Sequence, residues 1–448
     1  MTAAGLIILL CLILIILFSS REWAAAAVVA SVLYLPLGLH ANIGGINFFA
    51  ERFIEIAGFV RIVSKRELRD IQLNEIDKGL MLFQIVYLFI STVFILLNPD
   101  TDETWIGRFS FFCDGVLSYF IFRALISEPR VFKKLLRICA YLIVPFAASM
   151  LIESMTGKNL FTSLGATLPD EPNMRGGGFR AQGSFGVSIT AGCFGATLLP
   201  LFVAAILIEK KRFWGLTGIA ASLLIVVQSR SGTPLLSLAA AVFGWLCWKM
   251  RSQMKFVRWG VVLSLIFFTL MMTQPVWVIF GRLGDITGGH GLDRAADIEN
   301  FVSHFGNWWL MGMSSENMSG WDVARLPNGS IDMLNEYASI GIGGGMISLV
   351  LFIRLILKCF KGLGTTMQSV RKQGADHIRD DLLLWGIGCS LFSHVIAISG
   401  VIYWDQMYVI WYMALALVAS LTGYFLQEPI PARAGLDSEM PDTLLTSA

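Results

Sequence analysis

The stretch AAGLIILLCLILIILFSS, residues 3–20, contains no charged side chain and consists almost entirely of aliphatic residues. A helix rises about 1.5 Å per residue, so a run of nearly 20 residues reaches across the ~30 Å hydrocarbon core of a bilayer. The run is long for the apolar core of a signal peptide, lacks a basic segment before it, and is followed at once by another apolar run. We therefore expect it to be a retained membrane helix.

The rest of the chain repeats this pattern. Of its 448 residues, 55% are hydrophobic and 15% are charged, whereas soluble domains carry about 25% charged residues. These numbers predict an all-α polytopic membrane protein of about twelve transmembrane helices (range 11–13), with a long outer loop before the tenth. The apolar runs lie at 4–20, 23–39, 79–97, 107–127, 136–153, 185–208, 213–228, 233–249, 257–273, 334–359, 382–400 and 403–426.

The stretch INFFAERFIEIAGFVRIV, residues 46–63, carries four charged side chains at nearly helical spacing: Glu51, Arg52, Glu55 and Arg61. This pattern favours an amphipathic helix lying in the membrane interface. A thirteenth span is the alternative.

Basic residues in short loops predict the orientation, because cytoplasmic loops are enriched in Lys and Arg. Five such loops fall on one face if the twelve spans alternate, so we expect that face and both termini to be cytoplasmic. The basic loops are 65–78, 130–137, 210–212, 249–258 and 358–379. Residues 1–426 then form a single membrane domain, and the polar residues 427–448 form a cytoplasmic, disordered tail.

The opposite face receives the loops 154–184 and 274–333, and arginines at this face run against the orientation rule. Arg175 and Arg180 lie in RGGGFRAQGSFGVSITAG, residues 175–192, just ahead of an apolar run. Arg230 lies in VVQSRSGTPLL between two apolar runs, and Arg282 follows PVWVIFG. An arginine at a membrane boundary is costly unless it snorkels, pairs or binds an anion.

Two interpretations of these arginines stay open. One is an interface anchor or a salt bridge to a carboxylate of the same loops, namely Asp170, Glu171, Asp285 or Asp293. The other is a phosphate clamp, because guanidinium matches phosphate oxygens bidentately and glycines and a helix N-terminus bring backbone N–H groups to the same anion. A phosphate at this boundary indicates a lipid-linked phosphate such as a polyprenyl diphosphate carrying a sugar. Arginines would stabilise the departing diphosphate.

Four segments, taken in order, resemble a known family. FRAQGSFGVSITAGCFGATLLPL, VVQSRSGTPLLSLAAAVFGW, FGNWWLMGMSS and LNEYASIGIGGGMISLVLF are similar to segments of O-antigen ligase and O-antigen polymerase-like proteins. Asn335, Tyr337 and Gly345 match the family's spacing where the chain re-enters the membrane. The resemblance covers roughly residues 100–425.

The resemblance implies a glycosyltransferase of the bacterial inner membrane that needs no metal and no other cofactor. It would move a glycan from an undecaprenyl diphosphate carrier to a sugar hydroxyl on the periplasmic face, in O-antigen, lipopolysaccharide or exopolysaccharide biosynthesis. The acceptor would be a lipid-core sugar for a ligase and another lipid-linked chain for a polymerase. Arg180 and Arg230 would bind the diphosphate, with Arg282 as a third and Arg175 in support.

The family's histidine before the re-entry Asn is replaced here by Leu334. In DMLNEY, residues 332–337, Asp332 and Glu336 stand at i and i+4, so they share a helix face and are candidate bases. With Asn335 they make up the predicted catalytic set. The alternatives are that Asp332 caps the helix and that Glu336 is an ordinary polar residue.

Glycan-contacting candidates are Trp308, Trp309, Tyr337 and His290. Tryptophan faces bury the apolar side of a sugar, although anchoring in the interface explains the tryptophans equally well. His290 lies in the glycine-rich TGGHGLD. Apart from donor and acceptor we expect membrane lipids and other polysaccharide-assembly proteins as partners, and no nucleic acid. Two other functions are kept: a lipid-linked glycan transporter or flippase, and a non-catalytic component of an export system.

Overall fold

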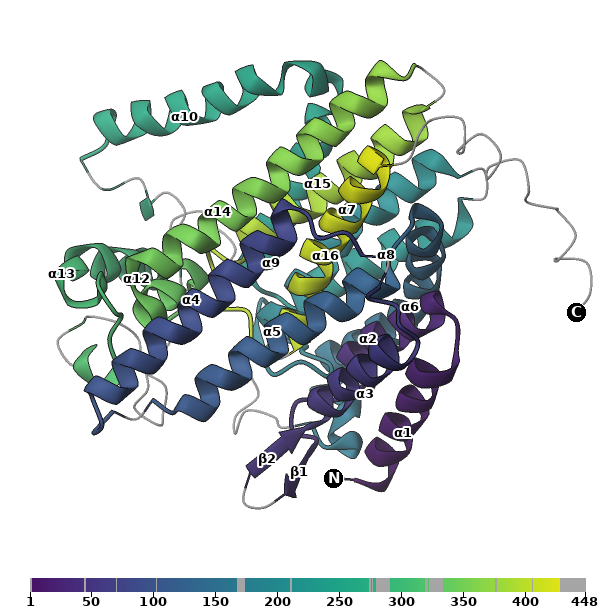
Figure 1. Cartoon of the computed structure of the whole chain (residues 1–448), viewed down its shortest axis with the longest axis horizontal. Coiled ribbons are helices and arrows are strands. Elements are labelled where there is room, and N and C mark those ends of the chain that lie inside the picture. The colour runs from purple at the N-terminus through teal and green to yellow at the C-terminus, as the bar shows by residue number, and fades with distance from the viewer. Residues whose placement is uncertain are drawn as a thin grey trace, which may run out of the picture.

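The computed structural model describes residues 2–43, 46–69, 71–101, 103–166, 174–209, 212–273, 275, 277–278, 291–318, 321, 333–374, 377–404 and 406–427. This part of the chain is a bundle of α-helices with two short β-hairpins (Figure 1). The all-α class predicted from the sequence is confirmed.

Each of the twelve apolar runs contains one helix. These helices are α1 (Ala3–Phe18), α2 (Arg21–Tyr34), α4 (Glu75–Leu97), α5 (Trp105–Leu125), α6 (Pro129–Thr156), α7 (Ser188–Ile208), α8 (Phe213–Gln228), α9 (Gly232–Leu246), α10 (Met254–Met271), α14 (Glu336–Lys372), α15 (Ile378–Ala397) and α16 (Gln406–Gln427). The others are α3 (Ala50–Ser64), α12 (Gly291–Ser303) and α13 (Phe305–Trp308), with the hairpins β1–β2 (His40–Ile43, Ile46–Phe49) and β3–β4 (Met174–Arg175, Gly178–Phe179) and the 3-10 turns η1 (Leu160–Leu164), η2 (Cys247–Gln253) and η3 (Ser315–Met318).

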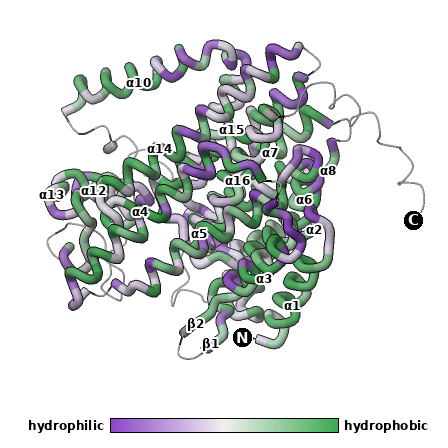
Figure 2. Tube along the Cα trace, viewed as in Figure 1, coloured by the Kyte–Doolittle hydropathy of each residue, from purple (hydrophilic) through white to green (hydrophobic). Residues whose placement is uncertain are grey.

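Within the described residues, seven helical segments are long and apolar enough to cross a membrane. They are Glu75–Leu97, Pro129–Thr156, Ser188–Ile208, Gly232–Met271, Glu336–Lys372, Ile378–Ala397 and Gln406–Leu426. Ala3–Phe18 and Phe213–Gln228 are apolar but shorter. Figure 2 shows the apolar residues running along the helices. The protein is therefore a helical membrane-spanning protein, and the count of about twelve spans stays a prediction.

The helix α3 packs lengthwise on α1, so it does not lie across the bundle. The chain enters α3 from β2, close to Leu39, and a Cβ built on Gly5 near the start of α1 would lie 2.7 Å from the Leu39 side chain. At the other end Arg61 of α3 donates to the carbonyls of Ile16 and Ser19, at 2.6 and 2.9 Å. Residues 50–64 thus form a helix packed on α1, and both alternatives, an interfacial helix and a thirteenth span, stay predictions.

The beginning of α1 and the beginning of α2 lie at opposite ends of the bundle. Thr2, ahead of α1, donates to the carbonyl of Leu164 in the loop 154–184. Arg21, at the start of α2, instead donates to Ser127 and lines a cavity of about 170 Å³ together with Gly423, near the end of α16. The beginning of α1 and the end of α16 therefore lie at opposite ends of the bundle, whereas the side of the membrane on which each terminus lies stays a prediction.

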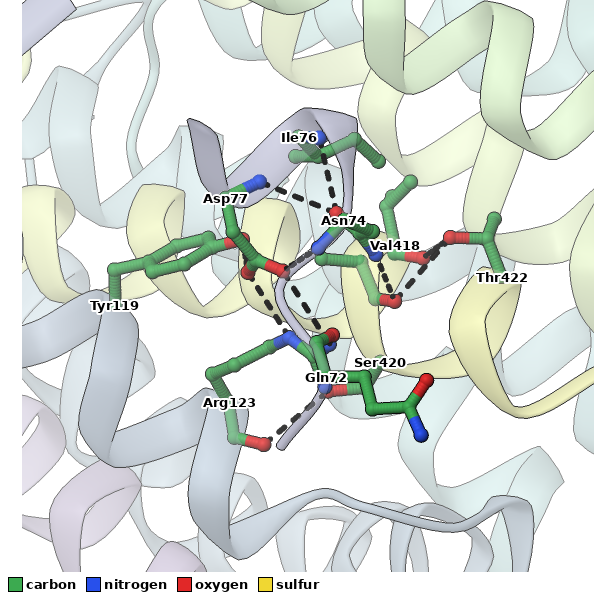
Figure 3. A network of polar contacts seen from close by, with 10 residues as sticks. Gln72, Asn74, Ile76, Asp77, Tyr119, Arg123, Val418, Ser420 and Thr422 are labelled. Carbon is green, nitrogen blue, oxygen red and sulfur yellow. Dashed lines mark hydrogen bonds and ion pairs between the residues drawn. The ribbon is translucent and has the colours of Figure 1, made fainter. Parts of the chain in front are cut away.

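A buried polar network joins α4, α5 and α16 at the end of the bundle where Arg21 lies (Figure 3). The Asp77 carboxylate accepts hydrogen bonds from Tyr119 at 2.6 Å and from Arg123 at 3.0 Å. Arg123 also donates to Ser420 of α16, and Asn74 caps α4 through the N–H groups of Ile76 and Asp77. Removal of one partner of such a buried ion pair strongly destabilises a protein, because the other charge is left buried and uncompensated.

The helix α10 is the exception to this packing. It extends away from the remaining helices in Figure 1, and none of its residues is buried. Its exposed side chains include Phe256, Trp259, Phe267 and Phe268. By contrast, α7 and α16 lie at the centre. In an apolar stretch of 18 residues in each of these helices, 83% is buried.

Candidate anion-binding site

The glycines at 176–178 form a tight hairpin. Arg175 pairs with Gly178 across β3 and β4, and the two turn residues, Gly176 and Gly177, have φ of +58° and +76°. Positive φ at both central residues is the hallmark of a type I′ turn, which glycine adopts without steric cost. The run of glycines is therefore explained first by the turn that it makes.

This hairpin closes on Arg230, which follows α8. The Arg230 guanidinium donates to the carbonyls of Arg175 and Gly176 at 2.9 and 2.8 Å, and to Ser154 at 3.2 Å. A Cβ on Gly178 would lie 2.6 Å from Arg230 Cζ, so only glycine fits there. The sequence analysis had placed these glycines around Arg180, and the structure places them around Arg230.

The backbone of Arg230 itself is unusual. Its φ is +46°, in the left-handed region that costs a non-glycine residue roughly 1–2 kcal/mol. Three hydrogen bonds to carbonyl and hydroxyl groups hold the side chain in place. Strained residues that the surroundings hold in place cluster at functional sites.

Arg180 enters the same region from the residue after β4. The next N–H, of Ala181, donates to the carbonyl of Gln228 at the end of α8, and Arg180 Nη2 donates to Ser231 Oγ at 2.7 Å. The Arg180 Nε atom is buried and has no hydrogen-bond partner. Arg180 therefore keeps an unused donor inside the site.

Two positive charges lie near Arg180, those of Arg175 and Arg294. In the described part of the chain, Arg175, Arg180 and Arg230 form no ion pair with a carboxylate. Burial, together with the nearby charges of Arg175 and Arg294, lowers the pKa of Arg180 to about 10. The guanidinium is still charged at neutral pH, so the site is a partly buried concentration of positive charge without a counter-charge of its own.

The N-terminus of α7 adds to this field. Its first turn has no side-chain cap, and Ser188 Oγ lies 3.5 Å from Ser231 Oγ, the acceptor of Arg180. The helix begins at Ser188, three residues after the start of the apolar run 185–208, and its N-terminal end lies beside Ser231, the acceptor of Arg180. Helix N-termini with free N–H groups attract anions.

One carboxylate shapes the loop that bears Arg180. Glu153, near the end of α6, accepts hydrogen bonds from the N–H groups of Gln182 and Gly183, at 3.2 and 2.9 Å. It also accepts from the Asn159 side chain. The loop after Arg180 is thus fixed through its backbone.

The predicted catalytic segment forms the start of α14. Asn335 caps the helix by accepting from the N–H groups of Tyr337 and Ala338. Glu336 is 3% exposed and accepts from the Tyr403 N–H and the Tyr408 hydroxyl. The Tyr337 hydroxyl donates to the Val395 carbonyl. In the structure all three residues bind neighbouring protein groups and fix the entry of α14.

The loop between α15 and α16 joins this segment to the arginines. Gly400 accepts a hydrogen bond from Thr233, three residues after Arg230. The neighbouring Ile398 and Ser399 carbonyls accept from Glu336 N–H and from the Asn335 side chain. The arginine site and the start of α14 therefore lie at the same end of the bundle, on either side of one short loop.

The neighbouring residues Trp308 and Trp309 differ sharply in their exposure to solvent. Trp308 is 2% exposed, stacks on Phe301 at 4.0 Å and donates to its carbonyl, so it is a core residue and not a glycan platform. Trp309 is 46% exposed and keeps its ring available. Of the pair, Trp309 alone retains the role expected from the sequence.

Arg282, His290 and Asp332 lie outside the described residues, as do Asp170, Glu171 and Asp285. The sequence analysis missed Arg294, which α12 brings close to Arg180. The available signal was RAADIENF, residues 294–301, whose apolar and polar residues alternate at helical spacing within the outer loop.

The fold and the site together define a helical membrane-spanning protein with a partly buried cluster of arginines at one end. Comparison with known protein families and with curated proteins finds no match for this chain.

Proposed function

We propose that the arginine site binds the diphosphate of a polyprenyl-linked glycan and that the protein transfers this glycan to a sugar hydroxyl. The single observation that supports this most strongly is Arg180, a partly buried guanidinium with an unused Nε donor and with the positive charges of Arg175 and Arg294 nearby. An anion is the ligand that such a site stabilises.

The arrangement suits a displacement at the sugar carbon. The acceptor hydroxyl attacks the anomeric carbon, the bond from that carbon to the diphosphate oxygen breaks, and the diphosphate leaves with the electron pair. Arg180 and Arg230 stabilise the charge that develops on the leaving oxygen. A single displacement inverts the configuration at the sugar carbon. Trp309, with an exposed ring, would offer a stacking surface for the glycan.

The proposed location is the outer face of a bacterial inner membrane. The basic loops 65–78 and 130–137 belong to the end of the bundle opposite the arginine site, which agrees with a cytoplasmic position for them. On this orientation the beginning of α1 is periplasmic and the end of α16 is cytoplasmic. The resemblance to O-antigen ligases and polymerases supports the same reaction class, with a lipid-core sugar or a lipid-linked chain as acceptor.

A transporter of lipid-linked glycans is the second candidate, because charged groups lie deep between helices. Glu55 of α3 is 5% exposed and accepts a hydrogen bond from Ser118 of α5, and Asp77 pairs with Arg123. Paired ionisable residues inside a membrane domain mark proton or substrate pathways in transporters. A transporter moves the intact donor, whereas a transferase releases free polyprenyl diphosphate.

Binding of polyprenyl diphosphate without a glycan, by the full-length protein in lipid nanodiscs, tests the site. We expect Arg180→Ala and Arg230→Ala each to weaken binding by at least tenfold, because each removes a charge-assisted hydrogen-bond donor worth roughly 1.5–3 kcal/mol. Arg212→Ala, an exposed arginine ahead of α8, is the matched control and should bind as the unaltered protein does.

The reaction is tested with lipid-linked glycans extracted from a strain that lacks the protein. Mass spectrometry should detect release of free polyprenyl diphosphate by the unaltered protein and a loss of release in both variants. Equal binding by Arg180→Ala would overturn the anion site. Movement of the intact donor across a proteoliposome membrane without release would favour the transporter.

A further inference from the structure

A cavity of about 170 Å³ lies at the end of the bundle opposite the arginine site. Its lining includes Arg21 at the start of α2, Glu67 and Gln72 in the linker between α3 and α4, Arg123 of α5 and Gly423 of α16. Pockets for drug-sized ligands measure roughly 300–1,000 Å³, so this cavity suits a smaller group. The transfer reaction proposed above does not use it.

One wall of the cavity is fixed by a buried ion pair at the end of α3. The Glu67 carboxylate accepts hydrogen bonds from Nε and Nη2 of Arg61, both at 3.1 Å. Arg61 is 2% exposed and also donates to the carbonyls of Ile16 and Ser19 at the end of α1. Glu67 therefore has a counter-charge of its own and is held in one position.

The second wall contains the ion pair between Asp77 and Arg123 (Figure 3). The Arg123 side chain is 7% exposed and donates to the Asp77 carboxylate at 3.0 Å. It also donates to the Ser420 hydroxyl at 3.3 Å and to the Gln72 carbonyl at 3.2 Å. Both walls are thus built from buried, paired groups that the fold keeps apart.

Arg21 is a cation of the lining that is held more loosely. Its side chain is 35% exposed. Its Nε lies 3.4 Å from the Glu67 carboxylate, which Arg61 binds at shorter distances, and its Nη1 donates to the Ser127 hydroxyl at 3.0 Å. Within the described residues no hydrogen bond uses its Nη2. Arg21 therefore offers a charged donor to a ligand in the cavity.

The charges around the cavity favour an anion. Among the described residues of the lining and of the two ion pairs, the guanidinium groups outnumber the carboxylates by one. The guanidinium groups are those of Arg21, Arg61 and Arg123, and the carboxylates are those of Glu67 and Asp77. Salt screens buried charges much less than exposed ones, so the excess positive charge acts on a ligand in the cavity.

A phosphate group has the charge and the size that this cavity accepts. Guanidinium donors match phosphate oxygens. A cavity of ~150 Å³ holds one benzene molecule in another protein, so this one has room for a phosphate and a few attached atoms. Trp23, 54% exposed in the first turn of α2, is a residue type that anchors helices at the headgroup level of a bilayer. Basic pockets between membrane helices bind anionic headgroups.

We propose that the cavity binds a phosphate group, which Arg21 contacts and which the buried charge of Arg123 attracts. The phosphate is carried by an anionic lipid headgroup or by a small soluble ester. No residue of the arginine site takes part, so this inference does not depend on the transfer reaction. Gly423 keeps the space free, because a Cβ built on it would lie 3.8 Å from Nη2 of Arg123 and a longer side chain would fill the cavity.

The test uses the full-length protein in dodecyl maltoside micelles, whose detergent contains no phosphate. The probes are phosphatidylglycerol, followed by native mass spectrometry, and glycerol phosphate, followed by calorimetry. We expect Arg21→Ala to weaken binding of the preferred probe about tenfold, the scale of one lost charge-assisted hydrogen bond. Gly423→Leu should abolish binding by filling the cavity, and it should fold because leucine favours a helix more than glycine does.

Arg212→Ala, at an exposed position ahead of α8, is the control and should bind both probes as the unaltered protein does. Diacylglycerol, which has the lipid tails but no phosphate, should bind the variants and the unaltered protein equally. Binding of phosphatidylglycerol alone identifies a lipid headgroup, and binding of glycerol phosphate with similar affinity identifies a soluble ester. If neither probe binds, or if Gly423→Leu binds as tightly as the unaltered protein, the cavity holds only water and the inference is wrong.

Discussion

Single residues of the arginine site show what the sequence could and could not indicate. The position of Arg180 and Arg230 at a membrane boundary was visible because permanent charge next to an apolar run is unusual. Their partners were not, since Arg230 is held by carbonyls of residues 175 and 176, more than 50 positions away. Which arginine the glycines enclose follows from the hairpin register, and no local pattern predicts that register.

Removal of the Arg180 charge should stabilise the ligand-free protein. The pKa of Arg180 in the folded protein, about 10, lies below its ordinary value of 12.5, so its charge opposes folding at neutral pH. This opposition is complete below pH 10 and disappears as the pH rises from 10 toward 12.5. We expect Arg180→Met to raise the melting temperature by roughly 1–3 °C at pH 7.5.

Nanodisc samples heated at pH 7.5 and at pH 10.5 provide the measurement. The difference between Arg180→Met and the unaltered protein should shrink at the higher pH. Arg212→Met, at an exposed position, should have no such effect at either pH. A lower melting temperature for Arg180→Met at pH 7.5 would mean that the guanidinium is a structural anchor.

At the scale of elements, the break in α14 was not predicted. Gly345 has φ +72°, and at this point the outer segment docks into the helix: the Met313 N–H donates to the Ile342 carbonyl and the Met346 N–H donates to the Trp309 carbonyl. The apolar pattern of residues 334–359 is continuous through the break. Helical periodicity does not reveal it, because the missing hydrogen bonds are replaced by backbone groups from a distant segment.

Gly345→Ala should therefore undo this docking. A Cβ at position 345 would lie 2.6 Å from the Leu310 carbonyl oxygen, and the positive φ alone costs a non-glycine residue about 1–2 kcal/mol. We expect the segment 309–318 to become readily cleaved by protease in nanodiscs and diphosphate binding to persist. Gly364→Ala in the same helix has no neighbour within 4 Å and should be neutral or stabilising by up to ~1 kcal/mol. Equal protease resistance in the two variants would contradict this account.

At the scale of the whole molecule, composition was enough to predict the class of protein but not the path that the chain follows through the bundle. The helical membrane class follows from apolar length alone. The course of residues 46–63 does not, because their charged residues suggested a polar face. In the structure, Glu55 and Arg61 are buried with partners, Ser118 for the first and Glu67 for the second. Pairing of charges inside the bundle is a tertiary property, and the bundle places the beginning of α1 beside the loop 154–184.

Labelling of single cysteines tests on which side of the membrane α1 begins. In a background with Cys11 and Cys113 replaced by alanine, Thr2→Cys should react with a membrane-impermeant maleimide in intact spheroplasts, because position 2 adjoins the loop that bears Arg180. Ser252→Cys, in the exposed turn between α9 and α10, should react only after permeabilisation. Labelling of both positions from the same side would support the topology expected from the sequence, in which the beginning of α1 is cytoplasmic.

The hydrogen bonds that Glu153 accepts affect how the positive charge of the arginine site is neutralised. Its carboxylate accepts hydrogen bonds from the two backbone N–H groups after Arg180 and from the Asn159 amide. The protein thus has a carboxylate near its arginines, but this carboxylate accepts hydrogen bonds from the backbone and forms no ion pair with Arg175, Arg180 or Arg230. Among the described residues no carboxylate pairs with Arg175, Arg180 or Arg230, so in the function proposed above each bound anion would supply the neutralising charge and its departure would leave the cluster ready for another.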